Sequence, residues 1–70
     1  MEMKPVDSSN VVAVGHDAKK NRLRVEFRGG STYEYYGVPA AVAEDVITAP
    51  SVGGFFTRCI RGVYPHQKVA

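Results

Sequence analysis

Hydrophobic and polar residues alternate along residues 22–36, where the pattern of the chain is clearest. A period of two is typical of β-strands, because successive side chains point to opposite faces of a sheet. The pair Gly29-Gly30 divides the stretch into two strands, so the sequence predicts an antiparallel hairpin. Leu23, Val25 and Phe27 share one face of the first strand, and Tyr33 and Tyr35 share one face of the second.

A shorter apolar run at residues 11–14 predicts one more strand before the hairpin, since valine is frequent in strands. Residues 15–21 then contain a turn. Three consecutive antiparallel strands form a meander, which needs only short connections. Residues 1–9 read as a loose lead-in, because Pro5 and several small polar residues there are typical of turns.

Beyond the hairpin the apolar spacing changes to three and four residues, which is typical of helices. Pro39 suits the first helical position, and Pro50 ends that helix. Ser51 is the expected N-cap of a second helix, which ends at Gly62. Residues 63–70 form a tail that can pack back through its Tyr-Pro pair.

These elements predict a single small α+β domain over residues 1–70, in which a three-stranded antiparallel meander is followed by two helices packed on one face (βββαα). A hydrophobic fraction of 44% is sufficient for a globular core. The residues expected in that core are Leu23, Val25, Phe27, Val42, Val46, Ile47, Phe55 and Ile60.

The length of the hairpin loop decides which face the tyrosines occupy. A two-residue turn at Gly29-Gly30 places Tyr33 and Tyr35 on the solvent side with the arginines. A three-residue loop with Gly30 in a left-handed conformation places both rings in the core instead, opposite Val25 and Leu23. The bulk needed under the helices favours the three-residue loop, and Tyr36 is then the exposed aromatic residue.

Seven of the nine Lys and Arg residues lie in two groups, around the first hairpin strand and on the second helix. Cations that alternate along a strand beside aromatic residues are typical of a surface for single-stranded nucleic acid, although they also solvate an ordinary exposed face. A non-catalytic module for RNA or single strands is therefore the first functional hypothesis. Its candidate contacts are Arg22, Arg24, Arg28, Tyr36, Arg58 and Arg61, with Tyr33 and Tyr35 as the alternative to Tyr36 for base stacking.

Glycines at the start of the second helix define a candidate anion site at Ser51, Gly53 and Gly54. Backbone N–H groups are free at a helix start, and the helix dipole favours a negative charge there. The alternative is that Gly53 and Gly54 allow close packing of this helix. Both readings stay open at the level of the sequence.

No enzyme, cofactor or metal signature is present. Cys59 falls on the apolar stripe of the second helix, which favours an inert thiol, and two histidines with one cysteine make a poor metal set. His66 is expected to be a solvated tail residue. No apolar run approaches the ~20 residues of a membrane helix, and no secretion signal is recognisable, so a cytoplasmic location is expected.

A second functional hypothesis belongs to a different class. A three-stranded sheet has two open edges, and either can pair with a strand of another protein or of a second copy. A protein-interaction module or homodimer formed through a sheet edge is therefore the alternative to nucleic acid.

The residues also resemble a known family, the KTSC domain, which occurs at the C-terminus of some lysyl-tRNA synthetases and as a small bacterial or phage protein. The resemblance covers residues 8–64. The segments that carry it are Ser8-Ser9, Gly15-His16-Asp17, Leu23-x-Val25-x-Phe27-x-x-Gly30, Tyr33-Glu34-Tyr35, Val38-Pro39, Ser51-Val52-Gly53-Gly54-Phe55-Phe56 and Ile60-Arg61-Gly62.

The Tyr-x-Tyr pair is the hallmark of that family. The chain departs from the family pattern at His16, where Tyr is usual, and at Thr57, where Asn is usual. The synthetase context implies RNA as a partner, which agrees with the first hypothesis.

Overall fold

Two antiparallel strands, β3 (Arg22–Phe27) and β4 (Thr32–Tyr36), lie in the middle of the sheet. A computed structural model describes residues 1–70 and places β2 (Val11–Asp17) against the other side of β3. The predicted meander β2-β3-β4 is therefore confirmed. Its first strand is three residues longer than predicted, because pairing with β3 continues to Asp17 opposite Arg22.

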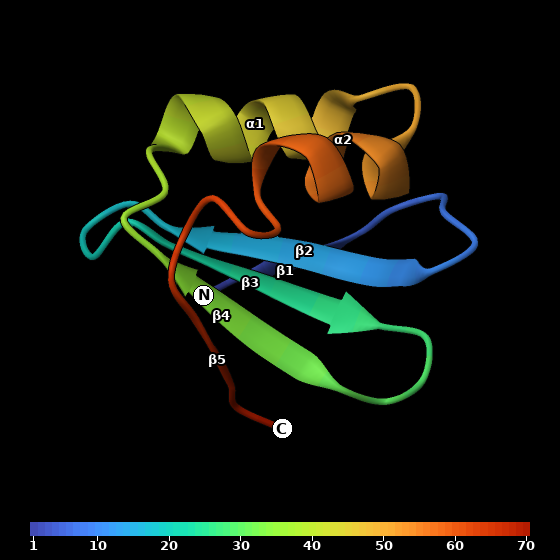
Figure 1. Cartoon of the computed structure of the whole chain (residues 1–70), viewed down its shortest axis with the longest axis horizontal. Coiled ribbons are helices and arrows are strands. Elements are labelled where there is room, and N and C mark those ends of the chain that lie inside the picture. The colour runs from blue at the N-terminus through green and yellow to red at the C-terminus, as the bar shows by residue number, and fades with distance from the viewer.

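The sheet has five strands, so the prediction of three was wrong. The supposed lead-in contributes β1 (Met3–Pro5), which pairs with β2, and the supposed tail contributes β5 (His66–Lys68), which pairs with β4. Figure 1 shows both chain ends lying along the sheet. Segments of three residues are too short to display a period of two, and they become strands because β2 and β4 offer unpaired backbone groups at their outer sides.

The register of the central hairpin confirms the three-residue loop. Leu23 lies opposite Tyr35 and Val25 opposite Tyr33. The N–H of Phe27 donates to the carbonyl oxygen of Ser31 over 2.8 Å, which closes the loop at residues 28–30. Gly30 has φ 96°, the left-handed conformation expected of it. Both tyrosines therefore point to the same face as the apolar residues of β3.

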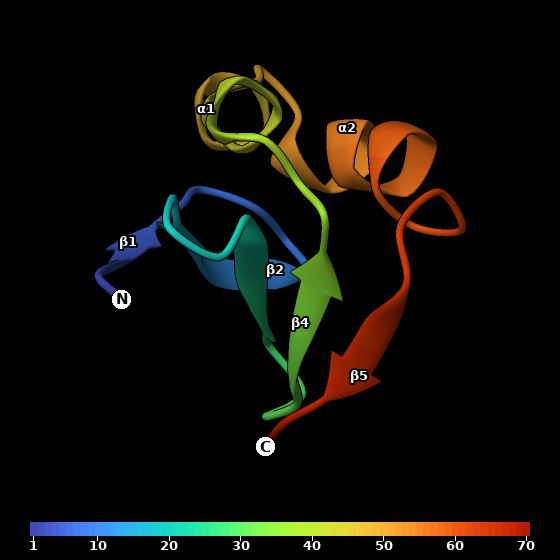
Figure 2. The same ribbon diagram turned by 90° about the vertical axis from the view of Figure 1, so that its left-hand side faces the viewer.

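Two helices cover that face, α1 (Ala40–Thr48) and α2 (Val52–Cys59), as Figures 1 and 2 show. Pro39 was predicted to be the first residue of α1, but its ψ of 155° is still extended. It is therefore the N-cap, and the helix begins at Ala40. Ser51 caps α2 as predicted, and its Oγ accepts a hydrogen bond of 3.3 Å from the N–H of Gly54. Gly62 follows α2 in a turn with φ 78°. Neither helix is long and apolar enough to cross a membrane.

Eleven buried residues from the sheet and both helices form one core. Of the predicted core, Leu23, Val25, Val46 and Ile60 are fully buried, whereas the remaining four are partly buried around them. Phe56 lies deeper than Phe55, because it stands one helical turn after the buried Val52. The other members of the core are Val11, Val14, Tyr35, Val38, Ala43, Val52 and Phe56.

Candidate binding cavity

A cavity of about 260 Å³ opens between α2 and the β4–β5 side of the sheet. Both aromatic and polar side chains line it. Its lining consists of Asn10, Phe27, Tyr33, Tyr35, Phe56, Thr57, Arg61 and His66. We call this site the tyrosine cavity. Figure 2 shows α2 above the sheet and β5 beside β4.

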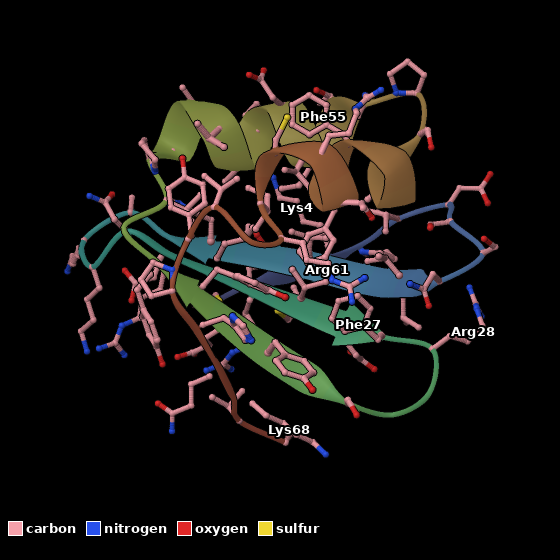
Figure 3. All side chains as sticks on the ribbon, in the orientation of Figure 1. Lys4, Phe27, Arg28, Phe55, Arg61 and Lys68 are labelled. Carbon is pink, nitrogen blue, oxygen red and sulfur yellow. The ribbon has the colours of Figure 1, made fainter.

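The register of the sheet decides which residues line the tyrosine cavity. Tyr33 and Tyr35 are two residues apart on β4 and so share the face that α2 covers. The pairing of β4 with β5 places His66 opposite Tyr35. Arg61 lies two residues after the end of α2, and Figure 3 shows it beside Phe27 beneath the helices. The cavity therefore depends on β5, a strand that the sequence pattern did not reveal.

Edge-to-face contacts hold the rings of the cavity in place. The ring of Phe56 lies 5.2 Å from that of Tyr35 and 5.5 Å from that of Phe27, between centroids. The imidazole of His66 lies 5.3 Å from the Tyr35 ring and 5.8 Å from the Tyr33 ring. Packing of this kind fixes ring orientation, so the aromatic walls are formed before a ligand arrives.

The electrostatics of the tyrosine cavity favour an anionic or hydrogen-bond-accepting ligand. No Asp or Glu lines it, and Arg61 takes part in neither ion pair of the structure. Burial raises the pKa of the Tyr35 hydroxyl, the charge of Arg61 opposes this rise, and Tyr33 adds to it. Tyr35 therefore carries its proton at neutral pH and can donate it. Neither tyrosine hydroxyl is bonded to another group of the protein, so both are available to a ligand.

Three of the candidate nucleic-acid residues lie on the opposite face of the sheet. Arg24 donates to Glu34 Oε2 from Nε over 3.0 Å and from Nη2, and Arg22 lies 3.9 Å from Glu34 Oε1. The guanidinium carbon of Arg22 stands 5.3 Å from the centroid of the Tyr36 ring, which confirms that this tyrosine lies beside an arginine. Glu34 is only 5% exposed, and its charge offsets the two cations.

The other three cationic candidates are scattered. Arg28 donates from Nε and Nη2 to the carbonyl oxygens of Ser9 and Ser8, at 3.1 and 2.9 Å, and thereby fastens the loop before β2. Arg58 is exposed on α2 and does not line the tyrosine cavity, whereas Arg61 does. The six candidates therefore do not form one patch, and Arg61 alone belongs to a cavity.

The glycines of α2 have local neighbours. A Cβ added to Gly54 would come within 2.9 Å of Ser51 Oγ, the oxygen that caps the helix. A Cβ on Gly53 would meet Ser8 Oγ at 3.4 Å, an ordinary contact. Gly54 therefore makes room for the cap, and no sheet or α1 atom crowds either position. Anion binding by Ser51 and the two glycines stays a prediction.

Seven of the eight residues that line the tyrosine cavity were not among the six preferred contacts: Asn10, Phe27, Tyr33, Tyr35, Phe56, Thr57 and His66. The Tyr-x-Tyr pair was assigned to the core, and Tyr35 is indeed buried, but the same rings also line the cavity. His66 was expected in solvent, and it is exposed while packing against both tyrosines. These residues come together because β5 pairs with β4, and the local sequence pattern does not predict that pairing.

A second hollow, of about 250 Å³, lies between β1 and α1 and has mixed charge, because Glu2, Lys4 and Glu44 line it. Nearby, His16 Nε2 is 2.7 Å from the carbonyl oxygen of Val38 and holds the chain before α1 against β2. No three His, Cys, Asp or Glu side chains lie close enough together to hold a metal ion. Cys59 is half-buried and free.

Comparison with known proteins identifies the family of this arrangement. The KTSC domain model matches residues 7–64. The chain belongs to the KTSC family. The Tyr-x-Tyr hallmark of KTSC domains thus falls inside the tyrosine cavity, and Thr57, where the family usually has Asn, lies on the wall of the same cavity.

A crystal structure of a KTSC domain protein from Yersinia pestis superimposes with a TM-score of 0.95 at 33% identity, covering 99% of this chain and 97% of the other. A protein from Tsukamurella paurometabola is 41% identical over 59 residues, which are 84% of this chain and 88% of the relative. A lysine–tRNA ligase from Nostoc punctiforme is 35% identical over 68 residues, 97% of this chain but 12% of the ligase. The KTSC fold therefore occurs both nearly alone and as a small part of a much longer enzyme.

Proposed function

We propose that this KTSC domain is a non-catalytic module that binds single-stranded RNA, with one unstacked base or sugar in the tyrosine cavity. The observation that carries the proposal is the composition of the cavity, which combines aromatic walls with an unpaired arginine and contains no carboxylate. Unpaired bases are recognised by stacking on aromatic rings, and cations beside them hold the phosphates.

The cations around the tyrosine cavity extend the proposed contact surface. Lys68 of β5 lies opposite Tyr33 of β4, and Arg28 is the first residue of the loop that follows Phe27. Figure 3 shows Lys68 at the lower end of β5 and Arg28 at the edge of the sheet beyond Phe27. A strand that places a base in the cavity would have Lys68 near its phosphates, because Lys68 pairs with the lining residue Tyr33. The relatives named lysine–tRNA ligase support the choice of RNA as the partner.

The test is a titration of a fluorescently labelled RNA decamer with the domain, followed by anisotropy at two salt concentrations. Binding should weaken as salt rises, because each phosphate contact releases counterions. Arg61→Gln should weaken binding by about tenfold, the loss of one charge-assisted contact. Arg58→Gln is the matched control, since it removes the same charge three residues earlier, on α2 and outside the cavity.

Two results would contradict the proposal. One is a lack of RNA binding at low salt. The other is an equal effect of Arg58→Gln and Arg61→Gln, which would indicate nonspecific attraction to a basic surface and not a role for the cavity.

Pairing through a sheet edge has less support. The edges of the expected three-stranded sheet are occupied by β1 and β5. The new edge strands have three residues each, and they carry Pro5 and Lys68, residue types that discourage further pairing. A strictly monomeric domain in light scattering at high concentration would agree with this.

A further inference from the structure

His66 lines the tyrosine cavity with ring nitrogens that no other group of the protein uses. Its imidazole lies 5.3 Å from the Tyr35 ring and 5.8 Å from the Tyr33 ring, between centroids, so the two tyrosines fix its position. The one hydrogen bond that a histidine ring makes in this structure is that of His16, and neither ion pair includes His66. Both nitrogens of His66 are therefore available to a ligand in the cavity.

The charged groups that face His66 are cations. Arg61 lines the same cavity, and Lys68 lies two residues along β5 and so on the same face of that strand. From β4 it meets Tyr33 and Tyr35, which are phenols and carry no charge at neutral pH. The lining side chains of α2 are uncharged, and no Asp or Glu lines the cavity. The protein itself therefore offers a proton on His66 no carboxylate partner, but an anionic ligand would supply one.

From this arrangement we infer that His66 is a proton-dependent anion contact: in its protonated form it binds a phosphate of the ligand together with Arg61. The inference rests on the proposed function and adds the regulation of the same site by pH. Histidine changes its charge between about pH 5 and 8, and the imidazolium form donates from both nitrogens. Hydrogen bonds between charged groups are roughly twice as strong as neutral ones. Binding should therefore take up a proton and become tighter as the pH falls.

The surroundings of His66 are compatible with its charged form. A cation within about 6 Å of an aromatic centroid is attracted to the face of the ring, and both tyrosine rings lie within that distance. The planes of the His66 and Tyr35 rings are inclined by 31°, closer to a stacked than to an edge-to-face arrangement. His66 is also exposed, so water reaches it. The imidazolium can therefore form without loss of the packing that keeps it beside the cavity.

The experiment measures the binding of a labelled oligouridine decamer, with hydroxyls at both ends, at about pH 7.5 and about pH 5.5 and at constant salt. Uracil bases and phosphodiesters keep their charge over that range, so the RNA itself does not titrate. The wild type should bind about tenfold more tightly at the lower pH, the effect of one charge-assisted contact.

Two variants assign the effect to His66. His66→Gln should remove the gain at the lower pH, so that its two affinities agree. His66→Lys carries a permanent charge, and it should bind more tightly than the wild type at neutral pH and lose the pH dependence. Both variants keep His16, the other histidine of the chain, so an effect of His16 would persist in them. Circular dichroism at both pH values checks that each variant is folded.

The outcomes separate this inference from the proposed function. RNA binding that is equally tight at both pH values in the wild type overturns the inference and leaves RNA binding intact. An equal gain at the lower pH in the wild type and in His66→Gln assigns the proton to another group and also overturns it. A lack of RNA binding at both pH values overturns the inference and the proposed function together.

Discussion

The ring of Tyr35 and the imidazole of His66 face each other across β4 and β5, with centroids 5.3 Å apart and planes inclined by 31°. Tyr35 belongs to the family hallmark, and His66 belongs to an edge strand of three residues. Their contact joins the core to the edge of the sheet and forms one wall of the tyrosine cavity. Changes to this pair should therefore affect both stability and binding.

Stability at high pH should depend on Tyr35. Burial raises its pKa above the ordinary value of 10.0, so the folded state holds the phenol proton more tightly than the unfolded state does. The resulting stabilisation is fully present below about pH 10 and is lost as pH rises through the folded pKa. Urea midpoints measured from neutral to alkaline pH should fall more steeply in the wild type than in Tyr35→Phe. The same slope in both proteins would contradict the prediction.

Glu34 should stabilise the outer face of the sheet. Glu34→Gln removes the charge that Arg24 binds through two nitrogens, and we expect a loss of about 1–3 kcal/mol in the free energy of unfolding. The Arg24 side chain is 39% exposed, so water screens part of the cost and the lower end of the range applies. Glu26→Gln is the control, because Glu26 is in neither ion pair. Equal denaturant midpoints for the two variants would refute this role.

Gly15 should be required for β1 to join the sheet. A Cβ at this position would lie 2.6 Å from Met3 Sδ and 2.8 Å from the carbonyl oxygen of Glu2. The backbone oxygen cannot move without moving β1, so Gly15→Ala should cost about 1–3 kcal/mol. Hydrogen exchange should become faster at the amides that pair β1 with β2. Gly29→Ala should leave exchange unchanged, since nothing lies within 4 Å of its added Cβ.

The two glycines of α2 should respond in opposite ways to alanine. Gly53→Ala meets only an ordinary contact with Ser8 and should stabilise the domain by up to about 1 kcal/mol through helix propensity. Gly54→Ala crowds the Oγ of Ser51 and should destabilise it by about 1 kcal/mol through loss of the cap. Thermal unfolding of the two variants tests the difference. A large loss from Gly53→Ala would show that this position is more tightly packed than its neighbours indicate.

The central hairpin could be predicted because its two strands are long enough to display a period of two, and because the bulk of its side chains decides between two loop lengths. The same logic placed Tyr35 opposite Leu23 and Tyr36 beside an arginine. The local sequence pattern was sufficient to predict a strand or helix wherever that element buries one of its faces.

The edge strands could not be predicted in this way. Residues 3–5 and 66–68 bury little surface, and their structure comes from hydrogen bonds to distant partners. The tyrosine cavity shares this origin, since it needs β5 and the end of α2 to meet over β4. Charge on the outer face was misleading for a related reason: alternation places Glu34 beside Arg22 and Arg24, but only the folded sheet shows that Glu34 is buried between them.

The three-residue loop at residues 28–30 has a consequence for how KTSC sequences can diverge. Loop length sets the parity of β4, and parity decides whether Tyr33 and Tyr35 or their neighbours Thr32 and Glu34 face the helices. Insertions and deletions in this loop should therefore be tolerated in pairs of residues and rejected singly. A survey of loop lengths among homologues should show odd values wherever the Tyr-x-Tyr pair is kept.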